Sequence, residues 1–190
     1  SKVKEAIIDT GFKNLFLIPS SSALSGAEIE LAYEEKREFF LKNAINTIKD
    51  DFDFIIIDSP PALGMLTINI MTATDTVLIP IQCEYYALEG LSQLIQSIRT
   101  VKKSLNPKID IEGVLATMYD GRTNLAIQVL DEVKKYFPKK VYSTVIPRNV
   151  RLSEAPSFGE PIVSYDITSK GAESYLNLAA ELIKKNKEVI

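Results

Sequence analysis

The chain has 190 residues, of which 46% are apolar and 25% are charged, with a net charge of −3, no histidine and one cysteine, Cys83. Without histidine the sequence excludes Ser-His and Cys-His catalysis and lacks the commonest transition-metal ligand. A single cysteine excludes an intrachain disulfide, and no apolar run reaches the ~20 residues that a membrane span needs. These limits favour one globular domain over residues 1–190, in a reducing compartment.

Leu15–Ile18 is the first apolar run, and because Pro19 and a serine cluster close it, we expect a strand there. Ala27–Lys49 follows, and the apolar spacing of its second half predicts a helix. Phe54–Ile57 is then a short, continuous apolar run, as in a parallel strand that is buried on both faces. The sequence Asp58-Ser59-Pro60-Pro61 stops this run.

Strands and helices continue to alternate in the second half. The predicted strands are Thr76–Ile81, Ile111–Met118 and Val141–Ile146. Two helices are expected at 88–101 and 124–137, each with one apolar face. A last helix, which Ser169 caps, is expected to bury Ala172, Tyr175, Leu176, Ala179, Leu182 and Ile183. This alternation predicts an α/β domain with a mainly parallel sheet and right-handed crossovers.

Charge is unevenly distributed along the chain. Residues 1–95 hold seven Lys/Arg against 14 Asp/Glu, whereas residues 96–190 hold 15 against 11. A basic second half allows a local anion-binding patch, although such asymmetry also occurs without any function. The negative net charge argues against a protein that coats nucleic acid with its whole surface.

Asp58 is a site candidate because ligands of open α/β sheets bind at the carboxyl ends of the strands. A carboxylate directly after a strand can hold Mg²⁺ beside a nucleotide's phosphates, or it can simply hydrogen-bond the turn. Pro60, Pro61 and Gly64 come next. They suit a switch that senses the γ-phosphate, and they equally suit a rigid turn.

Further candidates lie in the loops after the later strands. Arg122, Arg148 and Arg151 can bind nucleotide phosphate, DNA phosphate or an acidic neighbour, or they can remain solvated. Met118 and Pro147 end two strands and can either sandwich a flat base or pack the strand termini. The sequence contains no G-x-x-x-x-G-K-[ST] loop and no G-x-G-x-x-G fingerprint, so it supplies no phosphate cradle of either type.

Five ordered segments carry a family resemblance. They read LIPSSSALSGAEIEL, DFIIIDSPPALGMLTIN, VLIPIQCEYYALEGLSQL, TMYDGRTN and IPRNVRLSEAPSFG. Together they closely resemble the ParA/Soj family of deviant Walker-type partition ATPases, from about Leu15 to the C-terminal helix. The segment DSPPALG, with its two prolines, is more similar to ParA than to the related MinD proteins.

The resemblance implies a P-loop NTPase-like three-layer α/β sandwich that binds ATP and Mg²⁺ and forms a nucleotide sandwich dimer. It also implies that this homodimer binds DNA without sequence preference and that a ParB-type partner stimulates hydrolysis. The implied location is the cytoplasm, on the nucleoid, with no membrane partner.

The family's functional positions fall on named residues of this chain. Asp58 matches the Walker B aspartate and is the expected catalytic and metal-binding residue. Arg122 and Arg151 match basic positions that the family uses to bind DNA. Met118, with the loop Pro147-Arg148-Asn149, matches the place where the family holds the adenine base.

The sequence departs from the family at its front, because the first strand, the lysine-rich phosphate-binding loop and a second strand with a magnesium-site aspartate are expected before Leu15 and are not found. We therefore expect the chain to be the C-terminal portion of a ParA-type ATPase that does not hydrolyse ATP alone. One alternative is a non-enzymatic module that binds DNA or a partner. Another is a MinD-like membrane-cycling ATPase, which would need a basic amphipathic C-terminal anchor.

Overall fold

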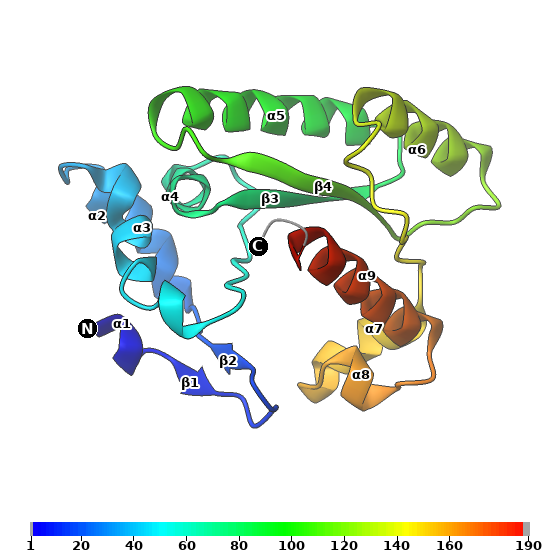
Figure 1. The fold of residues 1–190 in the computed structure, drawn as a ribbon, viewed down its shortest axis with the longest axis horizontal. Coiled ribbons are helices and arrows are strands. Elements are labelled where there is room, and N and C mark those ends of the chain that lie inside the picture. The colour runs from blue at the N-terminus through cyan, green and yellow to red at the C-terminus, as the bar shows by residue number, and fades with distance from the viewer. Residues whose placement is uncertain (1, 188–190) are drawn as a thin grey trace. The chain divides into compact units, whose positions relative to one another are not determined.

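The protein, described over residues 2–187 by a computed structural model, divides into two compact units. Unit 1 combines the chain up to Asp75 with residues 96–110, and unit 2 combines residues 76–95 with the chain from Ile111 onward. Figure 1 shows the elements of both units. Helix α5 (Ala87–Ser104) starts in unit 2 and ends in unit 1. A single domain over residues 1–190 stays a prediction.

Unit 1 consists mainly of short helices packed against helix α4 (Met65–Ala73). Its other elements are α1 (Lys2–Glu5), β1 (Ile8–Asp9), β2 (Phe16–Leu17), η1 (Ser22–Gly26), α2 (Ala27–Leu31), η2 (Arg37–Phe39), α3 (Phe40–Ile45) and η3 (Lys49–Asp51). The side-chain amide of buried Asn69 donates to the Arg37 carbonyl at 2.8 Å and accepts from the Leu41 N–H at 3.2 Å. Because a buried amide needs such partners, these bonds fix η2 and α3 on α4.

The first predicted strand forms, but in an antiparallel pair. β2 covers Phe16–Leu17 within the predicted run, and Ile8 of β1 lies opposite Leu17. The Asp9 carboxylate accepts from the Gly11 N–H at 2.8 Å, and Gly11 has a φ of +79°. This short, tightly turned connection permits only antiparallel pairing, because parallel strands need a much longer crossover.

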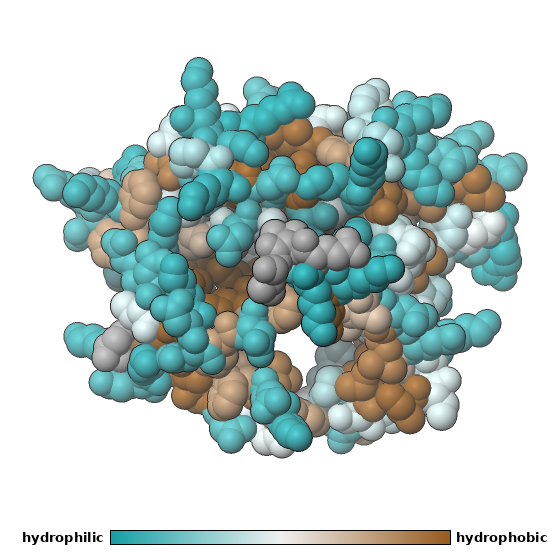
Figure 2. All heavy atoms as spheres, viewed as in Figure 1, coloured by the Kyte–Doolittle hydropathy of each residue, from teal (hydrophilic) through white to brown (hydrophobic). Residues whose placement is uncertain are grey.

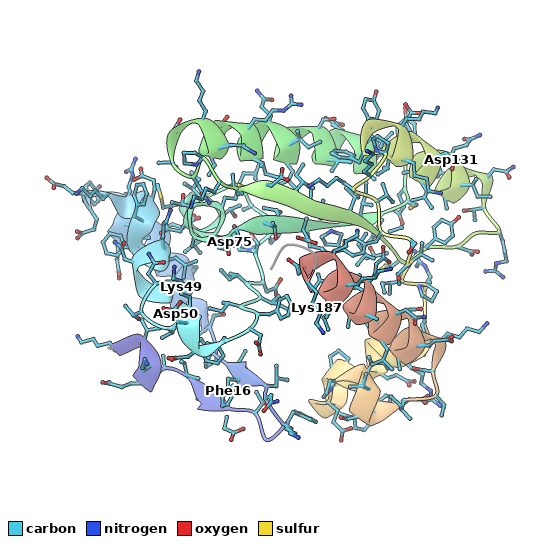
Figure 3. The ribbon with its side chains drawn as sticks, viewed as in Figure 1. Phe16, Lys49, Asp50, Asp75, Asp131 and Lys187 are labelled. Carbon is cyan, nitrogen blue, oxygen red and sulfur yellow. The ribbon has the colours of Figure 1, made fainter. Side chains whose placement is uncertain are left out.

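The predicted strand Phe54–Ile57 does not form. Its residues have no regular secondary structure, and the side chains of Phe54 and Ile56 are 48% and 88% exposed. A strand is held by ladder hydrogen bonds to a neighbour, and no described strand pairs with this segment. Just before it, Phe52 meets Phe16 of β2 edge-on at 5.8 Å between ring centroids; Figure 3 labels Phe16.

Unit 2 contains a sheet of β3 (Thr76–Gln82) beside β4 (Asp110–Thr117), within one residue of the predicted bounds (Figure 1). The Thr117 hydroxyl donates to the Ile81 carbonyl at 3.3 Å, which brings the carboxyl ends of both strands together. The Asp110 N–H donates to the Asp75 carbonyl at 3.1 Å at the other end. The two strands are therefore parallel, as expected when an 18-residue helix connects them.

The predicted strand Val141–Ile146 is interrupted. Val141 and Pro147 each form one parallel bridge to the segment that contains β4. Between these bridges the Ser143 and Thr144 N–H groups donate to the Glu181 carboxylate, at 2.9 and 3.0 Å, instead of to a strand. A side chain from a distant helix thus replaces the ladder in the middle of the segment.

Unit 2 contains the two helices predicted here, α6 (Asn124–Tyr136) and α9 (Lys170–Lys187). The sequence did not predict the short helices between them, which are α7 (Val150–Glu154), η4 (Ala155–Phe158) and α8 (Ile162–Tyr165). The Thr123 hydroxyl caps α6 by accepting from the Ala126 N–H at 3.3 Å. Five positions of this helix are expected to face inward. Ala126, Val129, Leu130 and Val133 are buried, whereas Phe137, the residue after the last turn, is half-buried.

Helix α9 confirms the predicted cap but not the predicted face. The Ser169 hydroxyl accepts from the N–H of Ala172, which is fully buried. Leu178 and Leu182 pack against the cluster of Leu115, Tyr142 and Ile146. The side chains expected inside that instead lie on the surface are Tyr175, Leu176, Ala179 and Ile183. The buried stripe is therefore rotated relative to the predicted one, and Glu181 contacts Ser143 and Thr144.

Large apolar side chains are exposed on both units. Phe16 and Leu17 of unit 1 and Tyr85 and Tyr86 of unit 2 are examples. Figure 2 shows apolar patches, in brown, among the polar side chains of the surface. Within residues 2–187, no helix has both the length and the apolar character to cross a membrane.

Candidate functional site

A cavity of about 920 Å³ lies in unit 2 at the carboxyl ends of β3 and β4. Its apolar wall includes Ile79, Ile81, Leu91, Leu94, Leu125 and Ala126, and its polar groups include Gln82, Glu84, Asp120, Thr123 and Arg148. The volume and the mixture of an apolar wall with a few polar groups are typical of small-molecule sites. The position agrees with the expectation that ligands bind at this edge of an α/β sheet.

Three of the four residues expected to hold a base lie together at this edge. Met118 and Arg148 both line the cavity. Tyr119, which follows Met118, forms a parallel bridge with Pro147, and its N–H donates to the Ile146 carbonyl at 3.0 Å. Met118 has a φ of +47° and a half-exposed side chain, so its sulfur-bearing chain is open to a ligand.

Asn149 has a structural task beside these residues. Its side-chain oxygen accepts from the Leu152 N–H at 3.4 Å and caps helix α7. The amide therefore orients the start of α7, the helix that carries Arg151.

Arg148 and Arg122 each meet a carboxylate. Arg148 lies 3.7 Å from Glu84, and both side chains are largely exposed. Arg122 forms a two-pronged pair with Asp120, at 2.8 Å from Nε and 2.7 Å from Nη2. The hydrogen bonds from the Arg122 side chain and backbone, assisted by the charges of Arg122 and Arg148, lower the pKa of Asp120 to about 2.

Arg151 is paired in the same way. Its Nη1 donates to Glu154 at 2.9 Å, and its Nε lies 3.3 Å from the Asp166 carboxylate. The hydrogen bond and charge of Glu154, with a smaller contribution from Tyr165, raise the pKa of Arg151 further. Of the roles that the sequence left open for the arginines, the structure contains the one with an acidic neighbour in all three cases.

The sequence analysis did not single out Asp120 and Glu84 as partners of these arginines. Both lie in the loops that directly follow predicted strands, so their place in the chain was the available signal. Cys83, beside Glu84, is buried, and burial raises the pKa of its thiol. A protonated, buried thiol is a poor nucleophile, so Cys83 is a packing residue here.

Asp58 belongs to unit 1. It lies in an exposed segment without regular secondary structure that ends at Gly64, the residue before α4. Within residues 2–187 no group of three or more Asp, Glu or Cys side chains is arranged to hold a metal. Mg²⁺ commonly takes one or two protein carboxylates and completes its shell with water and phosphate oxygens. The exposed carboxylate of Asp58 fits that limited requirement.

Glu28 is a further residue of unit 1 that the sequence analysis missed. Its carboxylate accepts from the Leu66 N–H in the first turn of α4, at 3.5 Å. It also fills the space that a Cβ on Gly64 would need. A side chain at position 64 would collide with Glu28, so this glycine allows the carboxylate to approach the helix that follows Asp58.

Comparisons with known proteins give consistent matches. The family described as "AAA domain" matches residues 1–111. The sporulation initiation inhibitor protein Soj of Bacillus subtilis is 61% identical over 180 residues, which make up 95% of this chain and 71% of that protein. The chromosome partitioning protein ParA of Myxococcus xanthus is 53% identical, and the match covers 97% of this chain and 65% of that protein.

A solved structure with the same fold is the cobyrinic acid a,c-diamide synthase from Mycobacterium smegmatis with a bound ATP analogue and magnesium. It superposes with a TM-score of 0.82 at 33% sequence identity. The similarity covers 100% of this chain and 70% of that one. The chain thus spans about two thirds of the length of the proteins that it matches.

Proposed function

The chain belongs to the Soj/ParA family of chromosome-partitioning ATPases, and we propose that it forms the greater part of an ATP-dependent DNA-partitioning protein. The proposal includes ATP and Mg²⁺ as ligands, nucleotide-driven dimerisation and DNA binding without sequence preference. It also includes a ParB-type partner and a place on the nucleoid in the cytoplasm. The observation that supports it most is the cavity at the strand ends, beside the residues expected to hold a base.

Named residues would hold the nucleotide and its metal. Asp58 would bind Mg²⁺ through one oxygen or through water. Met118, Pro147 and Arg148 would hold the base, and Asn149 would fix the helix that follows them. Bound Mg²⁺ supplies positive charge to the phosphate oxygens during phosphoryl transfer. This chain's own part is to bind the base and to hold a carboxylate beside the metal.

Arg122 and Arg151 would contact the DNA backbone. Both are long cations in loops or helix starts that follow strands of unit 2. Contacts to phosphates carry no sequence information, so binding should be non-specific and should weaken steeply with salt. Because one chain offers few such cations and its net charge is −3, useful affinity should need the dimer.

The test uses a chimaera, the loop-bearing chimaera, in which the N-terminal segment of the Bacillus subtilis relative precedes residues 1–190. That segment is where the phosphate-binding loop is expected. We expect Mg²⁺-dependent ATP hydrolysis that Asp58→Ala abolishes. Asp53→Ala is the matched control, because Asp53 is an exposed aspartate of the same segment. Hydrolysis that survives Asp58→Ala, or that both substitutions reduce equally, would contradict the role of Asp58.

A second candidate function is a non-enzymatic module that binds DNA or a partner. The chimaera separates the two functions, because a binding module would retain its DNA affinity without ATP, whereas a partition ATPase needs ATP for it.

A further inference from the structure

Arg122 is engaged by Asp120 through three donors. The Arg122 N–H donates to Oδ1 of Asp120 at 3.1 Å, Nε donates to the same oxygen at 2.8 Å, and Nη2 donates to Oδ2 at 2.7 Å. The two side-chain bonds use one whole edge of the guanidinium. It is one of the two edges through which a guanidinium can bind a phosphate or carboxylate with two parallel hydrogen bonds.

The hydrogen bonds of the turn before α6 hold Asp120 in place rather than the side chain of Arg122. Beside the bond from the Arg122 N–H, the Thr123 N–H and hydroxyl both donate to the Asp120 carbonyl, at 3.1 and 3.0 Å. The Asp120 side chain is 33% exposed, whereas that of Arg122 is 90% exposed. Asp120 is therefore built into the turn, and the solvent-exposed side chain of Arg122 bends toward it.

This pairing reduces the positive charge that Arg122 presents to a polyanion at the surface. An ionised carboxylate at 2.7 Å cancels the positive charge of the guanidinium at any distance larger than the pair itself. It also occupies one of the two edges of the guanidinium through which a phosphate could bind. Arg151 is held by Glu154 and Asp166 in a similar manner, but its contacts involve two separate carboxylates.

We propose that Asp120 masks Arg122, so that the phosphodiester backbone of a nucleic acid must displace this carboxylate before it gains the full contact with Arg122. The inference rests on the proposed DNA-binding function and adds a regulatory residue to it. Asp120 lowers the affinity of the unoccupied surface for phosphates, and only a densely charged ligand competes with it effectively.

The first test compares Asp120→Asn with Asp131→Asn in the loop-bearing chimaera, without ATP. Asparagine keeps the oxygen that accepts the Arg122 N–H, so the turn is retained while the charge is lost. Asp131, labelled on α6 in Figure 3, lies 3.8 Å from Lys134, and its replacement changes the net charge equally. Retention on phosphocellulose, whose phosphate groups stand in for DNA, is measured against KCl.

We expect Asp120→Asn to elute at higher KCl than both the wild type and Asp131→Asn, and Arg122→Ala to remove this gain in the double variant. For a short DNA duplex, one regained phosphate contact should steepen the slope of log affinity against log salt by about 0.9. Equal shifts for both asparagine variants, earlier elution of Asp120→Asn, or a gain that survives Arg122→Ala would overturn the proposal.

The proposed function is tested separately in the loop-bearing chimaera with ATP. If Arg122→Ala leaves the DNA affinity of the chimaera unchanged, the DNA-binding role of Arg122 is wrong. The phosphocellulose comparison still decides in that case whether Asp120 masks Arg122, because it needs neither ATP nor dimerisation.

Discussion

Glu181 of helix α9 binds the middle of the interrupted segment Val141–Ile146 of unit 2. Replacing it by glutamine should weaken this contact and make the Ser143 and Thr144 amides open more often. Its carboxylate accepts from the N–H and hydroxyl groups of Ser143 and Thr144, with all four distances between 2.9 and 3.0 Å. Burial alone would raise the pKa of Glu181, but these four donors outweigh it and lower the pKa from 4.5 to about 2. The folded segment therefore strongly favours the charged form.

The pKa shift gives the free energy by which the ionised Glu181 carboxylate stabilises the segment. At 1.36 kcal/mol per pKa unit, the ionised carboxylate stabilises the closed segment by about 3 kcal/mol relative to the neutral group. The side chain of Glu181 is 19% exposed, so screening by solvent is limited. Glu181→Gln imitates the neutral group. It should lower the hydrogen-exchange protection of the Ser143 and Thr144 amides by about 100-fold, at about 1.4 kcal/mol per factor of ten.

The pH dependence has a definite sign. Because the folded pKa lies below the unfolded one, the stabilisation is complete above about pH 4.5 and is lost as the pH falls toward 2. Wild type and Glu181→Gln should therefore converge in acid. Glu173→Gln on the exposed side of the same helix is the control and should change neither amide. Equal protection of the wild type and Glu181→Gln at pH 7 would refute the reasoning.

Four further outcomes are expected. The purified 190-residue chain should not hydrolyse ATP, and steady turnover in a phosphate-release assay would contradict this. The same chain should be poorly soluble or marginally stable, because it exposes large apolar side chains, and a cooperative monomeric melting transition would count against it. Gly113→Ala should destabilise unit 2 by about 1–3 kcal/mol in urea unfolding, since a Cβ would lie 2.5 Å from the Tyr142 ring, whereas Gly90→Ala in the open interior of α5 should be neutral or stabilising. In the chimaera with ATP, Arg122→Ala and Arg151→Ala should weaken binding to all DNA sequences alike in gel shifts and leave ATP binding intact.

The interrupted segment Val141–Ile146 shows which features could not be predicted from the sequence. The apolar run Val141–Ile146 correctly predicts that this segment lies beside β4. It does not reveal that the middle N–H groups bond to Glu181, which lies 37 and 38 residues farther along the chain. The buried stripe of α9 differs from the predicted one as well, so the apolar face of that helix could not be assigned from its own spacing.

Part of the candidate site could be predicted from the order of strands and helices. Met118 and Pro147 end strands, and parallel strands bring their carboxyl ends to one edge, so their meeting follows from the alternation of elements. The pairing of Arg148 with Glu84 and of Arg122 with Asp120 depends on side-chain positions in the folded loops. Arg122 and Arg151 each have a partner two or three residues away, and Arg148 has one in a different loop. Spacing along the chain does not by itself decide whether an arginine stays solvated or meets such a carboxylate.

The sequence by itself determined the helices α5 and α6, the strands β3 and β4, the cap at Ser169, and the family. These features depend on periodicity, capping and ordered motifs, which act over a few residues. The tertiary structure decided that Phe54–Ile57 forms no strand, that β2 pairs in the antiparallel direction, and that each arginine of the site is paired. The first two outcomes depend on which distant segment supplies the hydrogen-bond partners, because a strand is not stable without them. The ion pairs of the arginines depend on side-chain conformations in exposed loops.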